Sequence, residues 1–162
     1  MLSPKMLQAL NDQINAELYS SYLYLAMAAR CEALDLPGAA HWLRLQSKEE
    51  HEHAMKFFQY VNERRGEVKL QAIKEPPCSW NKLCQLFEDV LAHEQYISKR
   101  INDLVKLARD ENDYATENFL QWFVKEQVEE EATVDAVIKR LRLVGEMPQG
   151  LFFIDRELGQ RS

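Results

Sequence analysis

Residues 48–58, "KEEHEHAMKFF", place acidic and histidine side chains side by side in a stretch with helical periodicity. Core-facing residues of a helix bundle recur at alternating steps of three and four. Glu50 lies seven residues after Leu43, and His53 lies seven before Tyr60, so both are predicted to face the core. A buried carboxylate one helical turn from a buried imidazole is a typical pair of metal ligands.

The other charged side chains of this stretch fall on different faces of the same helix. Glu52 is predicted to point to the side opposite Glu50, and Glu49 and His51 to lie about 100° to either side of it. The run is therefore interpreted as two sets of residues, of which only Glu50 and His53 belong to the core.

Three more acidic residues and one glutamine lie in core register elsewhere in the chain. They are Glu17, Glu94, Gln127 and Glu130. Adding 77 to the positions of Glu17, Glu50 and His53 gives Glu94, Gln127 and Glu130, which suggests that the two halves of the chain are diverged copies.

Four buried glutamates, Glu17, Glu50, Glu94 and Glu130, repel one another and lose their hydration, so they need a compensating cation. A neutralising Lys or Arg, or a small rotation of the helices that exposes the glutamates, is the structural alternative. No Lys or Arg occupies a core-facing position at this level, which favours metal. Oxygen ligands with one imidazole suit Fe²⁺ or Mn²⁺, and Glu50 is placed to bridge two ions about 3.5–4 Å apart.

The elements that must position these ligands are four long helices and one short one. Ser3 and Pro4 mark the first start, Ser79 is predicted to cap the third helix, and Gly66 to end the second. The expected ranges are 4–33, 38–65, 80–110, 113–144 and 151–158.

The topology follows from the lengths of the connections. The segment between the second and third helices contains Pro76-Pro77, which excludes helix, and is long enough to run the length of a bundle. We expect an all-α fold in one domain over residues 1–162, with two antiparallel hairpins joined by one long crossover.

The bulk composition restricts the partners. The net charge of −6 disfavours a nucleic-acid surface, and no apolar run is long enough for a signal peptide or a membrane span, so a cytoplasmic protein is expected. Cys31, Cys78 and Cys84 form no C-x-x-C pair and are interpreted as reduced structural thiols.

Taken in order along the chain, several motifs resemble the bacterial non-haem ferritins. They are "LNDQINAELYSSYLY", "SKEEHEHAMKFFQYVNERRG", "HEQYISKRINDL", "NFLQWFVKEQVEEEATV" and "GLFFIDREL". The resemblance implies a ferritin-like bundle with a di-iron ferroxidase centre. It implies that Glu17, Glu50 and His53 hold the first iron and that Glu50, Glu94 and Glu130 hold the second.

The resemblance also implies roles for residues around the pair. Gln127 would be a hydrogen-bonding or weak ligand residue, and Tyr24 would assist electron transfer. A third iron site beside the pair would be formed by four glutamates. They are Glu49, Glu126, Glu129 and Glu130.

The implied reaction is oxidation of Fe²⁺ by O₂ or H₂O₂, with storage of ferric oxyhydroxide in a homo-oligomeric cage of twenty-four subunits. Residues 151–158 would line the four-fold axis of that cage. Glu117 matches one acid of the implied iron-entry channel, but Leu120 stands where the next acid is expected.

Four alternatives remain at the level of the sequence. A bacterioferritin would carry haem, but His51 occupies the position where the haem-binding methionine is expected, so no haem is predicted. A rubrerythrin-like peroxidase commonly adds a cysteine-rich iron domain, and the DNA-protecting mini-ferritins lack a fifth helix. A metal-free helical interaction protein, the alternative from a different class, would need the buried glutamates to be protonated or paired.

Overall fold

Five helices and no strand make up the computed structural model, which describes residues 1–162. Their bounds are α1 Pro4–Ala33, α2 Pro37–Glu63, α3 Leu83–Asp110, α4 Tyr114–Val144 and α5 Pro148–Leu158. The predicted all-α fold with four long helices and a short fifth one is confirmed.

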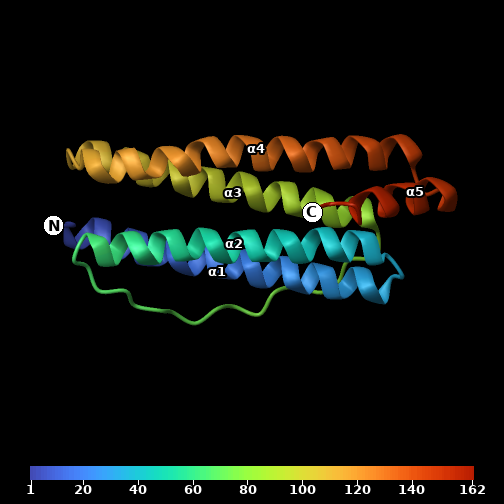
Figure 1. Ribbon diagram of the computed structural model, residues 1–162, viewed down its shortest axis with the longest axis horizontal. Coiled ribbons are helices and arrows are strands. Elements are labelled where there is room, and N and C mark those ends of the chain that lie inside the picture. The colour runs from blue at the N-terminus through green and yellow to red at the C-terminus, as the bar shows by residue number, and fades with distance from the viewer.

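The long helices form two hairpins, α1 with α2 and α3 with α4, that lie against each other (Figure 1). The crossover segment, residues 64–82, runs along the α1/α2 hairpin from one end of the bundle to the other (Figure 1). Side chains of α1 hold its backbone: Asn11 accepts from the N–H of Lys69 at 2.8 Å, and Asn15 donates to the carbonyl of Ala72 at 3.1 Å. The predicted long crossover is confirmed.

The start of α3 differs from the prediction. Ser79 does not cap it; the helix begins at Leu83, after Lys82, whose side chain makes no capping hydrogen bond. Trp80 accounts for the delay, because its indole N–H donates to Asp89 at 2.7 Å and its carbonyl accepts from Arg30 at 2.5 Å. These bonds hold the chain at Trp80 outside the helix, which begins three residues later.

Both ends of α2 also differ from the prediction. Helix α2 covers Pro37–Glu63 rather than 38–65, and the left-handed conformation after its end is taken by Arg65, with φ of 61°, and not by Gly66, which was expected to end the helix. Gly66 lies in close packing instead: a Cβ there would meet the Cδ1 atom of Leu7 at 2.7 Å and the Cγ1 atom of Val61 at 3.0 Å, so these side chains would have to shift.

Helix α5 begins at Pro148 instead of residue 151, with proline at a position where its missing N–H costs nothing. Helix α4 begins at Tyr114, one residue later than expected, because Asp113 is its N-cap and accepts from the N–H of Thr116.

The apolar core is divided into two clusters along the bundle. One gathers around Tyr24, Leu43 and Phe87, and the other around Leu10 and Phe57. Glu17 and Glu50 lie between them in sequence and in register, so a layer of polar side chains separates the two apolar regions.

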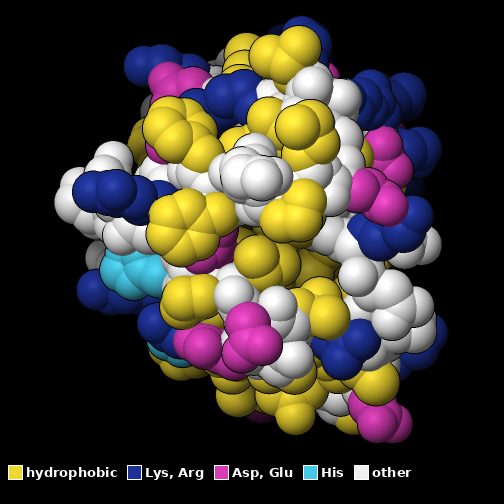
Figure 2. All heavy atoms as spheres, turned by 90° about the vertical axis from the view of Figure 1, so that its right-hand side faces the viewer, with side chains coloured by type: hydrophobic (Ala, Val, Ile, Leu, Met, Phe, Trp, Pro, Cys, Tyr) yellow, Lys and Arg dark blue, Asp and Glu magenta, His cyan; other side chains and the backbone are white.

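Helix α5 is attached to the start of α2. The Asp155 carboxylate accepts hydrogen bonds from the N–H groups of Gly38 at 3.1 Å and Ala39 at 2.8 Å, which caps α2 from outside its own chain segment. Apolar side chains gather at this end of the molecule (Figure 2). The exposed large ones at the C-terminal end of α4, on α5 and in their connection are Leu143, Met147, Phe152 and Phe153. None of the helices combines the length and the apolar character that a membrane span requires.

Candidate metal centre

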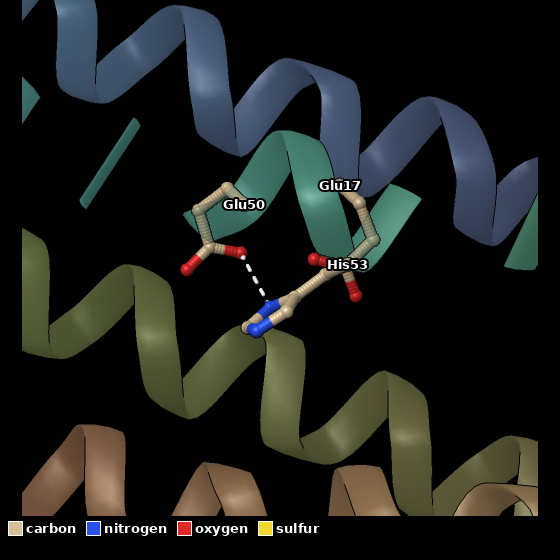
Figure 3. Close-up of side chains that lie close together, drawn as sticks. All are labelled: Glu17, Glu50 and His53. Carbon is tan, nitrogen blue, oxygen red and sulfur yellow. Dashed lines mark hydrogen bonds and ion pairs between the residues drawn. The ribbon is translucent and has the colours of Figure 1, made fainter. Parts of the chain in front are cut away.

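The centre is built from one carboxylate on each of the four long helices and an imidazole on α2. Relative exposure is 0 % for Glu17, 1 % for Glu50 and Glu94, 7 % for Glu130 and 4 % for His53. Figure 3 shows Glu17 reaching in from α1 toward Glu50 and His53 of α2. All five side chains lie in the interior, as helical register predicts.

Two groups of buried ligand atoms share one residue. In the first group, Glu17, Glu50 and His53 each offer an atom within 4.8 Å of the others. The second group is Glu50, Glu94 and Glu130, with the same limit on the distances. Glu50 is therefore the residue that the two fully buried groups have in common.

Hydrogen bonds fix the orientation of several ligands. Nδ1 of His53 lies 3.2 Å from a carboxylate oxygen of Glu50. The Tyr24 hydroxyl donates to Glu94 at 2.5 Å, and the Gln127 amide donates to the other oxygen of Glu94 at 3.0 Å. Gln127 therefore contacts the centre through its N–H₂ group, as a hydrogen-bond donor.

Two glutamines that were not predicted complete the surroundings of the carboxylates. The Gln13 amide donates to Glu17 at 2.8 Å. The Gln46 amide donates to Glu130 at 2.6 Å and to Glu50 at 3.2 Å. Each glutamine precedes a glutamate by four residues, a spacing at which helical side chains meet, and this signal is present in the sequence.

The electrostatics of the centre favour a cation. Burial raises the pKa of Glu130 to about 8 and that of Glu94 to about 7. Burial raises the pKa of Glu50 well above its usual value, and the neighbouring carboxylates raise it further. One oxygen of Glu17, Oε2, is buried without any hydrogen-bond partner. Such an orphaned acceptor among repelling carboxylates suits a bound divalent ion.

The residues expected at a third site are only partly brought together. Glu126 and Glu130 form a further group of candidate ligands with His53. Glu49 makes an ion pair with Arg161 at 2.9 Å, and Glu129 is exposed and joins none of the three groups. Glu52 is exposed, as helical register predicted, and His51, which was expected about 100° to one side of Glu50, is exposed as well.

The two residues considered for iron entry lie in different surroundings. Glu117 pairs with Arg109 at 2.6 Å, and Leu120 is buried in the core.

A bundle of two hairpins joined by a crossover, with an interior Glu-x-x-His and glutamates from facing helices, defines the ferritin-like class of di-metal carboxylate proteins. Comparison with known proteins agrees: a family model described as "Ferritin-like domain" matches residues 7–144. The chain therefore belongs to the ferritin family.

Individual relatives match over nearly the whole length. The chain is 43 % identical to a bacterial non-heme ferritin of Bacteroides fragilis, over 99 % of this chain and 100 % of the relative. It is 41 % identical to one of Escherichia coli, over 98 % and 96 % of the two chains. A solved open pore ferritin of Archaeoglobus fulgidus superimposes with a TM-score of 0.99 and is 51 % identical over 100 % of both chains. The resemblance to bacterial non-haem ferritins is thereby confirmed.

Proposed function

We propose that the protein oxidises Fe²⁺ at this centre and stores the ferric product. The observation that carries the proposal is the position of Glu50 in both buried ligand groups. Membership of the ferritin family supports iron as the metal and storage as the purpose. Iron is here a substrate, which enters as Fe²⁺ and leaves as Fe³⁺.

The residues divide between the two ions. Glu17, Glu50 and His53 hold the first Fe²⁺, and Glu50, Glu94 and Glu130 hold the second. Two Fe²⁺ ions held together supply the two electrons that, with two protons, convert O₂ to H₂O₂ or H₂O₂ to water. Carboxyl groups with raised pKa values release protons when the cations bind, because a ligating carboxylate must be ionised.

Side chains beside the ligands keep the site ordered through this cycle. Tyr24 and Gln127 donate to the two oxygens of Glu94 and so restrain the orientation of this carboxylate. Tyr24, whose hydroxyl touches a ligand, is also placed to pass an electron to the centre. Glu126, which faces Glu130, is the best supported member of a third site, with Glu49 and Glu129 as its proposed partners.

Storage requires a container, and the surface of the chain supports assembly. Exposed Phe152 and Phe153 on α5 make an isolated subunit unfavourable in water. The match to solved ferritins over the full chain supports a homo-oligomeric cage of twenty-four subunits that holds ferric oxyhydroxide. Haem has no role in this proposal, and the protein is placed in the cytoplasm.

Anaerobic titration with Fe²⁺ followed by aerobic oxidation tests the function. We expect saturable binding of two ions per chain, with a third bound more weakly, and rapid oxidation on exposure to O₂. The double variant Glu50→Ala and Glu130→Ala should lose rapid oxidation while it still assembles, as judged by size-exclusion chromatography. Glu52→Ala, which removes an exposed glutamate from the same helix, is the matched control. Absence of saturable binding in the unaltered protein would refute the proposal.

A further inference from the structure

Arg161, beyond the end of α5, reaches back to the helix that carries Glu50. Its guanidinium donates to the carbonyl of Trp42 at 3.1 Å and to Oε1 of Gln46 at 3.0 Å, and pairs with Glu49 at 2.9 Å. It also lies over the Trp42 ring, 4.5 Å from the ring centroid. A side chain with this many directed contacts has one preferred position.

The backbone around Arg161 is fixed as well. His41 Nε2 lies 2.7 Å from the carbonyl oxygen of Arg161 and donates to it. Asp155, six residues earlier, caps the start of α2. The C-terminal segment is therefore attached to α2 at successive points, and it returns from α5 toward the middle of the bundle (Figure 1).

The contact with Gln46 determines which way its amide faces. Arginine only donates hydrogen bonds, so the atom that receives its N–H must be the amide oxygen. The amide N–H₂ group then points the other way, where Oε2 of Glu130 and Oε1 of Glu50 accept from it. If the amide turned over, its N–H₂ group would face the Arg161 guanidinium at 3.0 Å, and two donors with no acceptor between them repel each other.

The same arrangement occurs on the other side of the centre. Arg100 of α3 donates to Oε1 of Gln13 at 2.9 Å, and the Gln13 amide donates to Glu17 at 2.8 Å. Two independent arginines thus orient two glutamines whose amides hold carboxylates of the centre. The difference is in their origin: Arg100 belongs to the bundle, whereas Arg161 comes from the segment after α5.

We propose that Arg161 is a positioning residue of the metal centre, which acts through Gln46 to hold Glu130 ready for the second ion. This inference rests on the proposed function, because it assigns a role within the same site. Mutation of a residue that hydrogen-bonds to a metal ligand typically lowers the affinity for the metal about 10–100-fold. The C-terminal segment is accordingly part of the centre as well as part of the α5 attachment.

The test compares Arg161→Gln with Arg156→Gln in the full-length, assembled protein. Arg156 is exposed on α5, so its replacement removes the same charge without touching Gln46. Anaerobic titrations with Fe²⁺, and with Co²⁺ to report ligand geometry by visible absorption, give the affinity of each ion. We expect Arg161→Gln to weaken the second ion about tenfold with the first within about threefold, and Arg156→Gln to bind like the unaltered protein. Arg161→Lys, which keeps one donor, should recover part of the loss.

A double-mutant cycle separates positioning from a general structural role. Gln46→Met has a similar volume but no amide, so Arg161→Gln should cause no further loss of second-ion affinity in that background. Additive losses, or unchanged second-ion affinity in Arg161→Gln, would overturn the inference while two ions still bound to the unaltered protein. Failure of that protein to bind two ions would instead refute the proposed function.

Discussion

The two hairpins contribute equivalent positions to the centre but support them differently. In the α1/α2 hairpin, each glutamate has a glutamine four residues before it: Gln13 before Glu17, and Gln46 before Glu50. In the α3/α4 hairpin the equivalent positions, 77 residues later, lie four residues before Glu94 and Gln127. They are occupied by the apolar residues Val90 and Phe123. The second hairpin therefore lacks supports of this kind.

The carboxylates of the second hairpin are held largely by the first. Tyr24 of α1 donates to Glu94, and Gln46 of α2 donates to Glu130. Only Gln127 supports a ligand from within the α3/α4 hairpin. The α1/α2 hairpin thus supplies most of the side chains that hydrogen-bond to the carboxylates of the centre.

The largest expected difference between the halves is at the equivalent positions 50 and 127. Glu50→Ala should abolish saturable binding of both Fe²⁺ ions and lower the initial oxidation rate at least about 100-fold, because both groups lose a ligand. Gln127→Ala should lower the rate only a few-fold, since it removes a hydrogen bond. Stopped-flow absorbance measures both rates. Equal losses in the two variants would show that the halves are equivalent.

The pH dependence of the metal-free protein is the next largest effect. The pKa values of Glu94 and Glu130, about 7 and about 8, lie above the ordinary value of 4.5, so folding favours their protonated forms. Stability from these groups is complete below about pH 4.5 and is lost as pH rises through about 7 to 8. We expect the metal-free protein to unfold at lower urea concentration at about pH 8.5 than at about pH 5.5, by up to a few kcal/mol.

A variant at Glu130 provides the control for this pH dependence. Glu130→Gln cannot ionise, so it should reduce the decline in stability, and adding Mn²⁺ at the higher pH should reverse the decline in the unaltered protein. A metal-free protein that becomes more stable over this pH range would contradict the assigned pKa shifts.

Giving position 127 the same residue type as position 50 should lower the melting temperature moderately. Gln127→Glu gives the second hairpin the carboxylate that Glu50 provides in the first, but adds a charge to a buried cluster. We expect the metal-free protein to melt about 2–8 °C lower near neutral pH, and Mn²⁺ to restore most of the difference. Gln127→Met, with similar size and no charge, separates repulsion from the loss of the hydrogen bond to Glu94. Equal melting temperatures for the two variants would exclude the electrostatic explanation.

The smallest expected effect concerns the contact of Tyr24 with Glu94. Tyr24→Phe removes one hydrogen bond worth about 1 kcal/mol, so the affinity for the second ion should fall about fivefold. Isothermal titration of Fe²⁺ without O₂ measures it. Tyr19→Phe is the control, because Tyr19 packs beside His93 and contacts no carboxylate of the centre. A larger loss of second-ion affinity in Tyr19→Phe than in Tyr24→Phe would show that the hydrogen bond from Tyr24 to Glu94 does not support the centre.

Helical periodicity was sufficient to predict the bundle and the inward-facing ligands. The repeats of three and four residues hold over long uninterrupted stretches, so the faces of Glu17, Glu94 and Glu130 followed directly. Boundaries were less accurate, because they depend on distant contacts. Trp80 lies outside α3 and contacts Asp89 and Arg30, and nothing in the residues next to Trp80 indicates either hydrogen bond.

The supports of the site could be predicted only in part. The four-residue spacing of Gln13 and Gln46 from their glutamates is visible in the sequence. The arginines that orient them are not, since Arg161 and Gln46 are 115 residues apart and meet only through the docking of α5. Core register correctly predicted that no Lys or Arg contacts the four glutamates of the centre directly. It did not predict the two arginines that contact them through the amides of Gln13 and Gln46.

The crossover segment offers a practical route to site-specific chemistry. Its residues 69–75 are exposed, and α1 holds it partly through backbone atoms such as the Lys69 N–H and the Ala72 carbonyl. Side chains in that stretch can therefore be replaced at little cost to the attachment.

The same segment carries Cys78, whose side chain is exposed. Cys31 is buried, which raises the pKa of its thiol to about 12, and burial also raises the pKa of Cys84. Because the thiolate is the reactive form, a maleimide probe at neutral pH should attach selectively at Cys78. A fluorophore or peptide can thus be fixed at one defined point of each chain without adding a cysteine.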